Sequence, residues 1–556
     1  MKVNASCPTS PEPSEKAKKY DRQLRLWDDH GQAALESSHV CLINATGAGT
    51  ELLKSLVLPG VGNFTIVDNK LVTAEDLGSN FFLNKQSIGK NRGEMACGLL
   101  SELNSDVRGN FVDDSVEQLL VNSPSFFDEF QLIVANDLSE KTICDLSERL
   151  WASDIPLILI KSVGFVGYMR IQLREHTVIE SHPDNAVEDL RLLNPFSELK
   201  SYLDSIDIES LSPQRLSHVP FPVLLYKHLS DYRSHSNESN ILAPLTRQQK
   251  REIQDAMRKA KRTVEDRMVA VKNGDFVDTN PKTVQDAENF EEAAKAVNTV
   301  LGGLDVPSEV QRILEDCKCV ELTPESSTFW VLCRALKDFV AEEGSLPVRG
   351  SLPDMTSDSD GYVALQKVYR DKAARDADVV ARRVRGLLRD LGRNADSISE
   401  QEVKLFCRNS AFLRLQRGTC VAKEFRQFPK LVDLGAELES GDSDLTFYVL
   451  LRAMERFRTD FGRYPGVLDA QIELDNMQLK ACVCKLLSES GTPVSIGDDY
   501  VQEITRYGAG ELHSVAAFVA GCAAQEAIKL LTRQYVPVDN TMIYNAIVSK
   551  CAVYKM

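Results

Sequence analysis

Residues 40–70, VCLINATGAGTELLKSLVLPGVGNFTIVDNK, place a β-rich run, a glycine-containing turn, a helical stretch and a second β-rich run in immediate succession. Further β-rich runs follow at residues 108–114, 130–137 and 156–173, with helical stretches such as 90–103 between them. This alternation predicts a largely parallel, doubly wound sheet, because parallel neighbours need a crossover connection that is usually a helix. We therefore expect an α/β, Rossmann-like fold.

The chain changes character beyond this region. The middle of the sequence is helix-rich and charged, whereas the C-terminal part returns to an apolar helix at 514–531 and a last strand at 541–548. A helix that is apolar on all sides is typical of a buried position. We therefore expect one sheet domain that is split by a large, mostly helical insertion. The predicted division is a flexible tail at 1–16, the first part of the sheet domain at 17–183, the insertion at 184–493 and a return segment at 494–556.

Charge and composition exclude several classes of function. The chain has 556 residues and a net charge of −16, which argues against nucleic-acid binding because phosphate neutralisation needs a basic face. The longest apolar runs, such as 155–160, are too short to span a membrane. The 13 cysteines are scattered and include no C-x-x-C pair. We therefore expect reduced thiols in the cytoplasm or nucleus, and no metal site.

The turn at residues 44–49, NATGAG, raises the question of nucleotide binding. Such a turn cradles a phosphate where glycines allow close approach and the helix N-terminus supplies free amides. Gly47 and Gly49 remain, but Asn44 and Thr46 carry side chains that would crowd a phosphate. Asp68 lies near the position of the ribose-binding acid of a dinucleotide fold, or it caps the following turn. The residues alone leave open a NAD(P)-dependent oxidoreductase and a structural turn.

The stretch YDRQLRLWDDHGQAALESSHVCLINATGAGTELLKSLVLPGVGNFTIVD resembles the opening of the enzymes that activate ubiquitin-like modifiers. These enzymes adenylate the C-terminal glycine of the modifier with ATP and then transfer it to a cysteine. Within that ubiquitin-activating enzyme family, the chain is most similar to the adenylation-inactive regulatory subunits of the heterodimeric neddylation-activating enzymes, whose plant forms act in auxin response. Five further stretches extend the similarity to the last helix: ESHPDNAVEDLRLLNPFSEL, LPVRGSLPDM, SISEQEVKLFCRNSAFLR, RYPGV and ELHSVAAFVAGCAAQEAIKLLT.

The resemblance also implies that the adenylation site has degenerated. Active members have G-x-G-G-x-G in the turn, where this chain has NATGAG. They end the second strand with D-x-D, where this chain has Asp68, Asn69 and Lys70, so that the ribose-binding carboxylate has become an amine. Ser79 replaces an arginine that contacts phosphate in active members. These losses together imply a fold that has lost its ATP site.

Three more positions agree with that interpretation. Arg92 replaces the lysine expected after the next turn. Leu138 falls where the magnesium-binding aspartate is expected, and Asp137 stands one position earlier. The catalytic cysteine of active members lies in a Pro-x-Cys-Thr segment, and Cys420 in RGTCVAKEF lacks both neighbours. The resemblance therefore implies that this chain binds no cofactor, and that its partner uses ATP and magnesium.

Arg22 and Gln23 form an R-Q motif in KKYDRQLRLW. On a helix, Arg22 could simply pair with Asp21, Asp28 or Asp29, an exposed bridge that stabilises little. In the dimeric activating enzymes, however, the inactive half sends this arginine into the ATP site of its partner. The resemblance therefore implies that Arg22 acts in trans, where a guanidinium stabilises developing phosphate charge, and that Gln23 supports it.

The resemblance also implies partners. We expect an obligate heterodimer with the catalytic subunit of the neddylation-activating enzyme, contact with the ubiquitin-like modifier, and contact with the cognate conjugating enzyme. The segment at 346–350 resembles a loop that contacts the partner subunit. Its residues alone are equally typical of an ordered linker between helices. A self-sufficient adenylating enzyme and a pure adaptor remain open as further hypotheses. The residues of the loop are Leu346, Pro347, Val348, Arg349 and Gly350.

Overall fold

The chain folds into two compact units. Unit 1 comprises Met1–Val178 and Leu415–Met556, and unit 2 comprises Ile179–Arg414. The structure, a computed structural model, describes residues 14–556 with the exception of 185, 187–188, 236–244, 275–286, 303–304, 427–437, 439–442 and 492–493.

The division differs from the one expected from the sequence. The first predicted boundary, at 183/184, lies five residues from the observed one at 178/179, but residues 415–493 belong to unit 1 rather than to the insertion. The described residues of this segment are mostly helical, like unit 2, so composition did not separate the two. Tyr448 and Leu450 are nevertheless buried in the core beside the sheet. Most of the predicted tail lies outside the described residues. Its end begins a helix, because Ser14 caps α1, Glu15–Lys19.

Eight strands of the described chain form one sheet in unit 1, in the order β10-β9-β6-β5-β4-β1-β2-β3. The strands from β3 to β5 run parallel, and β6, β9 and β10 add to one edge in antiparallel pairs. The predicted doubly wound α/β fold is therefore confirmed. The strand bounds are β1 His39–Ile43, β2 Asn63–Val67, β3 Arg108–Val112, β4 Leu132–Ala135, β5 Leu157–Val163, β6 Val166–Gln172, β9 Thr541–Asn545 and β10 Lys550–Tyr554, and β7 His176–Val178 pairs separately with β8 Arg414–Gln416.

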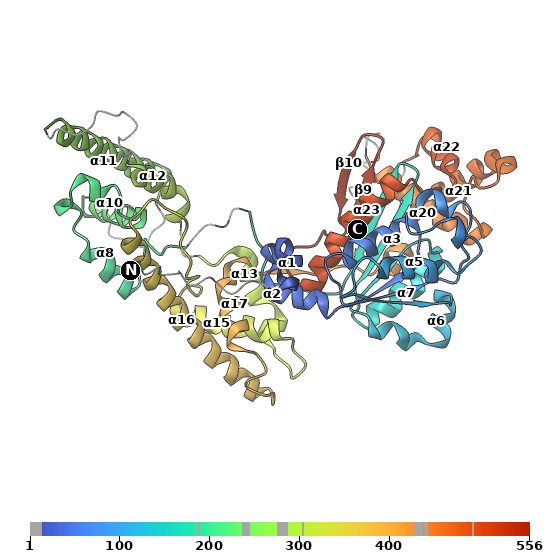
Figure 1. The fold of residues 1–556 in the computed structure, drawn as a ribbon, viewed down its shortest axis with the longest axis horizontal. Helices are drawn as coiled ribbons and strands as arrows, with labels where there is room; N and C mark the ends of the chain where they lie inside the picture. The colour runs from blue at the N-terminus through green and yellow to red at the C-terminus, as the bar shows by residue number, and fades with distance from the viewer. Residues whose placement is uncertain are drawn as a thin grey trace, which may run out of the picture. The chain divides into compact units, whose positions relative to one another are not determined.

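Helices cover both faces of this sheet (Figure 1). The main helices of unit 1 are α2 Asp21–Glu36, α3 Gly47–Val57, α4 Asp76–Ser79, α5 Arg92–Ser101, α6 Val116–Asn122, α7 Glu140–Ala152, α18 Val421–Arg426, α20 Leu445–Phe461, α21 Ile472–Ser490, α22 Asp498–Tyr507 and α23 His513–Thr532. Alternate residues of β1 point to opposite faces of the sheet: Val40 and Leu42 enter a core with α3, α5 and α23, whereas Cys41 and Ile43 enter a core with α7, α18 and α20.

Helix α23 was predicted to be buried, and it is. It packs against α3 and against β5 and β6, and its apolar positions, such as Val519 and Ala523, are fully covered. Among the described helices it is the one long and apolar enough to cross a membrane, but 56% of its most apolar window is buried inside the fold. Its apolar character is therefore explained by the core of unit 1.

Unit 2 is built from helices (Figure 1). Leu190, Phe290 and Tyr369 belong to its hydrophobic core, and all three are at most 2% exposed. The helical character expected for the insertion is confirmed. The helix bounds are α8 Ser197–Ser205, α9 Pro213–Leu216, α10 Phe221–His235, α11 Arg247–Gly274, α12 Glu288–Val300, α13 Ser308–Glu315, α14 Cys317–Val320, α15 Thr328–Glu343, α16 Ser359–Asp390 and α17 Glu400–Arg408.

The sheet register brings the predicted site residues together. Ile43 of β1 pairs with Val67 of β2 on one side and with Ala135 of β4 on the other. The residues that follow these strands therefore meet at the carboxyl edge of the sheet, where open α/β sheets form their ligand sites.

Candidate functional site

The turn after β1 is tied to the end of β4. Asn44 has a left-handed backbone with a φ of 66°, a conformation that glycine and asparagine tolerate best. Its side-chain nitrogen Nδ2 donates to the carbonyl oxygens of Asn136 at 2.9 Å and Asp137 at 3.1 Å, and the Asn136 side chain donates back to the Asn44 backbone carbonyl at 2.9 Å. Asparagine thus replaces glycine here without strain and adds a side-chain clamp.

The two retained glycines are required by packing within the chain. A Cβ atom on Gly47 would lie 2.7 Å from the carbonyl oxygen of Ser79. A Cβ atom on Gly49 would lie 2.7 Å from the side-chain nitrogen of Asn136 and 2.9 Å from the backbone carbonyl oxygen of Asn44. Real Cβ atoms do not approach so closely, so both positions need glycine whether or not a phosphate binds. Thr46 completes the turn as the N-cap of α3, its hydroxyl accepting from the Gly49 amide.

The amides at the start of α3 already hold an anion from the same chain. The Glu511 carboxylate accepts hydrogen bonds from the backbone N–H groups of Gly47 at 2.8 Å and Ala48 at 3.2 Å. These groups carry the positive end of the helix dipole and are the ones that would bind a phosphate. Burial raises the pKa of Glu511, and the two backbone donors oppose that rise. An internal carboxylate therefore takes the place of a phosphate oxygen.

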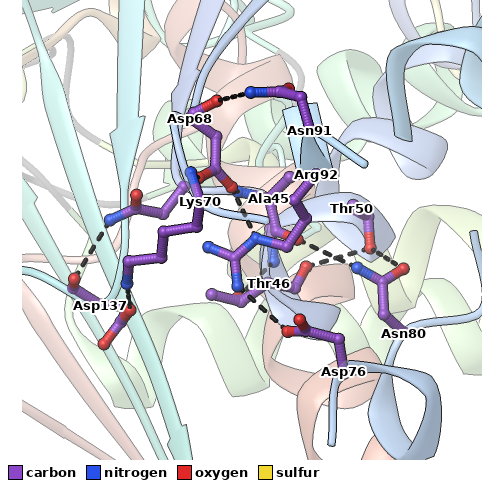
Figure 2. A network of polar contacts seen from close by, with 12 residues as sticks. Ala45, Thr46, Thr50, Asp68, Lys70, Asp76, Asn80, Asn91, Arg92 and Asp137 are labelled. Carbon is purple, nitrogen blue, oxygen red and sulfur yellow. Dashed lines mark hydrogen bonds and ion pairs between the residues drawn. The ribbon is translucent and has the colours of Figure 1, made fainter. Parts of the chain in front are cut away.

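Asp68, the acid at the end of β2, is turned inward. Its carboxylate accepts from the Ala45 amide at 2.8 Å and from Nε of Arg92 at 2.7 Å. Arg92 also donates to Asp76 at 3.1 Å, so its guanidinium lies between two carboxylates (Figure 2). The Arg92 and Asp68 side chains are only 7% and 0% exposed. This buried network fixes the turn through the Ala45 amide and leaves the Asp68 side chain without contact to solvent.

Lys70 and Asp137 neutralise each other at the same edge (Figure 2). Asp137, rather than Leu138, lines the cavity beside the turn, whereas Leu138 is buried in the core. Arg458 and Tyr464 of the segment after α18 also donate to the Asp137 carboxylate, at 2.8 and 3.1 Å. Burial raises the pKa of Asp137, but Lys70 and Arg458 outweigh burial and hold it below its usual value. Asp137, the carboxylate nearest to the expected magnesium position, is therefore already paired with Lys70 and Arg458.

A cavity of about 450 Å³ remains beside the turn. Carboxylates outnumber cations in its lining, and Ser79, the position at which the resemblance implies a lost arginine, contributes only a neutral side chain. Because a triphosphate is bound by cations and free amides, this lining opposes one. The charged residues of the lining are Glu75, Asp76, Asp137, Glu511, Arg92 and Lys161.

Arg22 and Gln23 lie on α2 and differ in their surroundings. Gln23 donates to the carbonyl oxygen of Pro59 at 2.8 Å and to Gln32 at 3.3 Å, which fastens α2 to the loop after α3. The Arg22 side chain is 94% exposed. Within the described part of the chain, its one ion pair is with Asp21 at 3.9 Å, and it forms none with Asp28 or Asp29. The expected helix-face pairing is therefore weak.

The chain matches known proteins over nearly its whole length. A model of the ThiF family matches residues 20–553. The NEDD8-activating enzyme E1 regulatory subunit of Xenopus laevis is 48% identical over 97% of this chain and 99% of its own length. The chain belongs to the ThiF family, among these regulatory subunits. The corresponding subunit of Danio rerio is 47% identical over 99% of this chain and 100% of its own, and AXR1 of Arabidopsis thaliana is 38% identical over 99% and 97%. The family expected from the sequence is confirmed.

The segment that resembles a partner-contacting loop is largely used inside unit 2. Leu346, Pro347 and Val348 are buried, and the Val348 amide donates to Asp376 at 3.0 Å. Arg349 and Gly350 are partly exposed. Three of the five predicted contact residues are therefore buried inside unit 2, and Arg349 and Gly350 are the two that remain partly exposed.

Cys420, the residue nearest to the sequence context of a family nucleophile, is buried. It is 4% exposed, and its sulfur lies 3.4 Å from the hydroxyl of Ser147 on α7. A thioester cysteine must reach its substrate, so this position does not suit one.

Sequence reasoning missed Glu511 and Arg458. Glu511 lies 464 residues from Gly47 in the chain, and an acid two residues before an apolar helix carries no signal of its own. The packing of α23 beside α3 brings it to the turn. Arg458 reaches Asp137 from α20, which the sequence had assigned to the insertion.

Proposed function

We propose that this chain is the adenylation-inactive, regulatory half of a heterodimeric NEDD8-activating enzyme. The names of its relatives, regulatory subunits of that enzyme, support this role. The observation that carries it is the Glu511 carboxylate on the Gly47 and Ala48 amides, which fills the anion position of the turn. The chain then contributes to adenylation through its partner.

In this proposal the chain binds neither ATP nor magnesium, and the catalytic subunit uses both. The three carboxylates that could serve a nucleotide or a metal are already engaged. Asp68 accepts from Arg92 and from the Ala45 amide, Asp137 is held by Lys70 and Arg458, and Glu511 caps α3. Opening any of these contacts would leave a charged group unpaired in a partly buried site, which is costly.

Arg22 supplies the chemical contribution in trans. When a modifier carboxylate attacks the α-phosphorus of ATP, negative charge shifts onto the departing pyrophosphate. A guanidinium placed there stabilises that charge, and it acts only in the assembled complex. The 94% exposure of Arg22 supports this role, because the side chain can enter a partner's site without breaking a strong contact. Gln23 supports the role by anchoring the same turn of α2.

A second contribution is structural. Unit 1 exposes large apolar side chains around the start of α23 and along the β9–β10 hairpin. Obligate interfaces are large and more apolar than ordinary surface. We assign this surface to the catalytic subunit. Its exposed members are Leu512, Phe518, Ile547, Val548 and Val553.

The remaining partners follow from the same role. The ubiquitin-like modifier and the cognate conjugating enzyme meet the assembled heterodimer, and the thioester forms on a cysteine of the catalytic subunit. The burial of Cys420 against Ser147 supports that assignment.

The test is reconstitution from purified chains. Native mass spectrometry of this chain mixed with the catalytic subunit should give a one-to-one complex. Modifier-dependent exchange of pyrophosphate into ATP should require that complex and be absent from this chain alone. Exchange by this chain alone would overturn the proposal and favour a self-sufficient adenylating enzyme, whereas failure to form a complex would remove the regulatory role.

A further inference from the structure

An arginine-lined groove lies on the surface of unit 2. It has a volume of about 540 Å³ and runs along α16 beside the start of α17. It shares no residue with the cavity at the turn of unit 1. The groove takes three arginines from one helix in a chain whose net charge is −16. Its charged residues are Arg375, Asp378, Arg382, Arg385 and Glu400.

Helix geometry explains why these arginines line up. Positions 375, 382 and 385 are separated by seven and three residues, which places them on one face of a helix. At a rise of about 1.5 Å per residue, the row extends over about 15 Å. The opposite face of α16 carries Val380, Val384 and Leu388, which are at most 1% exposed and face the interior. The basic row is therefore held by a well-packed helix and directed to solvent.

The groove already binds carboxylates from its own chain. Arg385 donates to Glu400 at 2.6 Å, and Arg375 pairs with Glu198 at 2.8 Å. These contacts show that carboxylates reach the guanidinium groups at both ends of the row. Glu400 and Glu198 are half or more exposed, so an incoming carboxylate could replace them at little cost.

The middle of the row is unoccupied by any acid of the described chain. Arg382 is exposed and, among the residues that the structure describes, forms no ion pair within 4.0 Å. Asp378 lies one turn before it on the same groove, but the two side chains do not meet. Val379 and Ala381 add a small apolar surface between the charges.

We propose that this groove docks an acidic peptide segment of a partner protein. An extended segment with several carboxylates can meet Arg375, Arg382 and Arg385 in turn, since arginine forks bind carboxylates in a bidentate manner. A small inorganic anion spans only one or two of these groups. The proposal does not rest on the adenylation role, because unit 2 supplies every residue of the groove.

A labelled hexaglutamate peptide tests the groove on the full-length chain. Fluorescence anisotropy at low salt should give saturable binding that weakens as salt is added, because exposed charge pairs are screened. Arg382→Ala should weaken binding about threefold to fivefold, the effect of losing one exposed ion pair. Arg382→Lys should retain part of the affinity, since it keeps the charge but loses the fork.

Arg370→Ala is the matched control. It removes one exposed arginine from α16 outside the groove, so binding should stay within the error of the wild type. Unchanged thermal melting of the variants would show that α16 remains folded. Equal weakening by Arg370→Ala and Arg382→Ala would overturn the proposal, and so would equal binding of hexaglutamine or of oligodeoxythymidine. Competition by millimolar inorganic phosphate would also overturn it in favour of a small-anion site.

Discussion

Arg92 and Arg22 belong to the same unit and satisfy their charges in opposite ways. Arg92 is 7% exposed and lies between Asp68 and Asp76 beneath the turn. Arg22 is 94% exposed, and its nearest carboxylate is 3.9 Å away. The charged groups beside the turn pair with one another inside the unit, whereas α2 exposes Arg22 to solvent.

The comparison shows how a turn of the nucleotide-binding type can be held together by contacts within its own chain. An anion site built from helix amides needs only one carboxylate to close it, and Glu511 provides that carboxylate. The glycines remain because the neighbouring backbone leaves no room for a side chain. Arg22 has no comparable internal partner, and the proposed function assigns it to the ATP site of the catalytic subunit.

The largest effect is expected from removing the buried arginine. Arg92→Leu leaves the Asp68 carboxylate without its charged partner in a buried position, which should lower the free energy of unfolding by about 3–5 kcal/mol. Urea denaturation of the full-length chain measures it. Arg426→Leu, which removes an exposed pair with Glu148, should change stability little. A similar loss in both variants would show that Arg92 is not an internal support.

The next effect concerns Arg22. Arg22→Ala should slow modifier adenylation by the heterodimer about 100-fold or more, as expected for a group that stabilises transition-state charge. Arg25→Ala is the matched control, since Arg25 is also exposed on α2 and pairs with Asp21. Pyrophosphate exchange measures the rate, and native mass spectrometry checks that both complexes remain intact. Equal rates for the two variants would remove the role in trans.

A smaller effect is expected at the turn itself. Glu511→Ala frees the Gly47 and Ala48 amides, which should cost about 1–3 kcal/mol because two partly buried donors lose their acceptor. Sulfate should restore part of this loss by binding the freed helix N-terminus. Melting temperatures in sulfate and chloride measure it, with Glu503→Ala on α22 as a control for general salt effects. An equal response to sulfate in both variants would contradict the assigned role of Glu511.

The smallest effect is a pH dependence from Asp137. Its pKa is lower in the folded chain than in the unfolded one because Lys70 and Arg458 outweigh burial. Its contribution to stability is therefore present above the unfolded value of about 4 and is lost as the pH falls below that value. Asp137→Asn should lower stability at pH 6 more than at pH 3. A constant difference across that range would show that the ion pairs do not stabilise the fold.

Much of unit 1 could be predicted from the sequence. The strand runs at 39–45, 63–68 and 130–137 became β1, β2 and β4, because short β-branched runs between turns are strong local signals. The alternation of elements then fixed their parallel order. Lost motifs at Asn44, Lys70 and Ser79 also pointed to a degenerate site, and the structure brings all three to the same edge.

The internal contacts of the site and the extent of unit 1 could not be predicted, because they depend on residues that are far apart in the sequence. Glu511 and Gly47 meet only because α23 packs beside α3. Asp137 faces the cavity, in place of Leu138, because its backbone turns to a φ of 50° directly after β4. The segment 415–493 joined unit 1 through buried residues such as Tyr448, which look the same in sequence as residues of any helical core. The burial of Val348 could not be predicted for the same reason.

The count of ATP molecules bound per heterodimer tests the central claim most directly. Equilibrium binding of labelled ATP in the presence of magnesium, with the modifier absent, should saturate at one ATP per heterodimer, and this chain alone should bind none. Two ATP per heterodimer, or saturable one-to-one binding by this chain alone, would contradict a turn that is closed by Glu511.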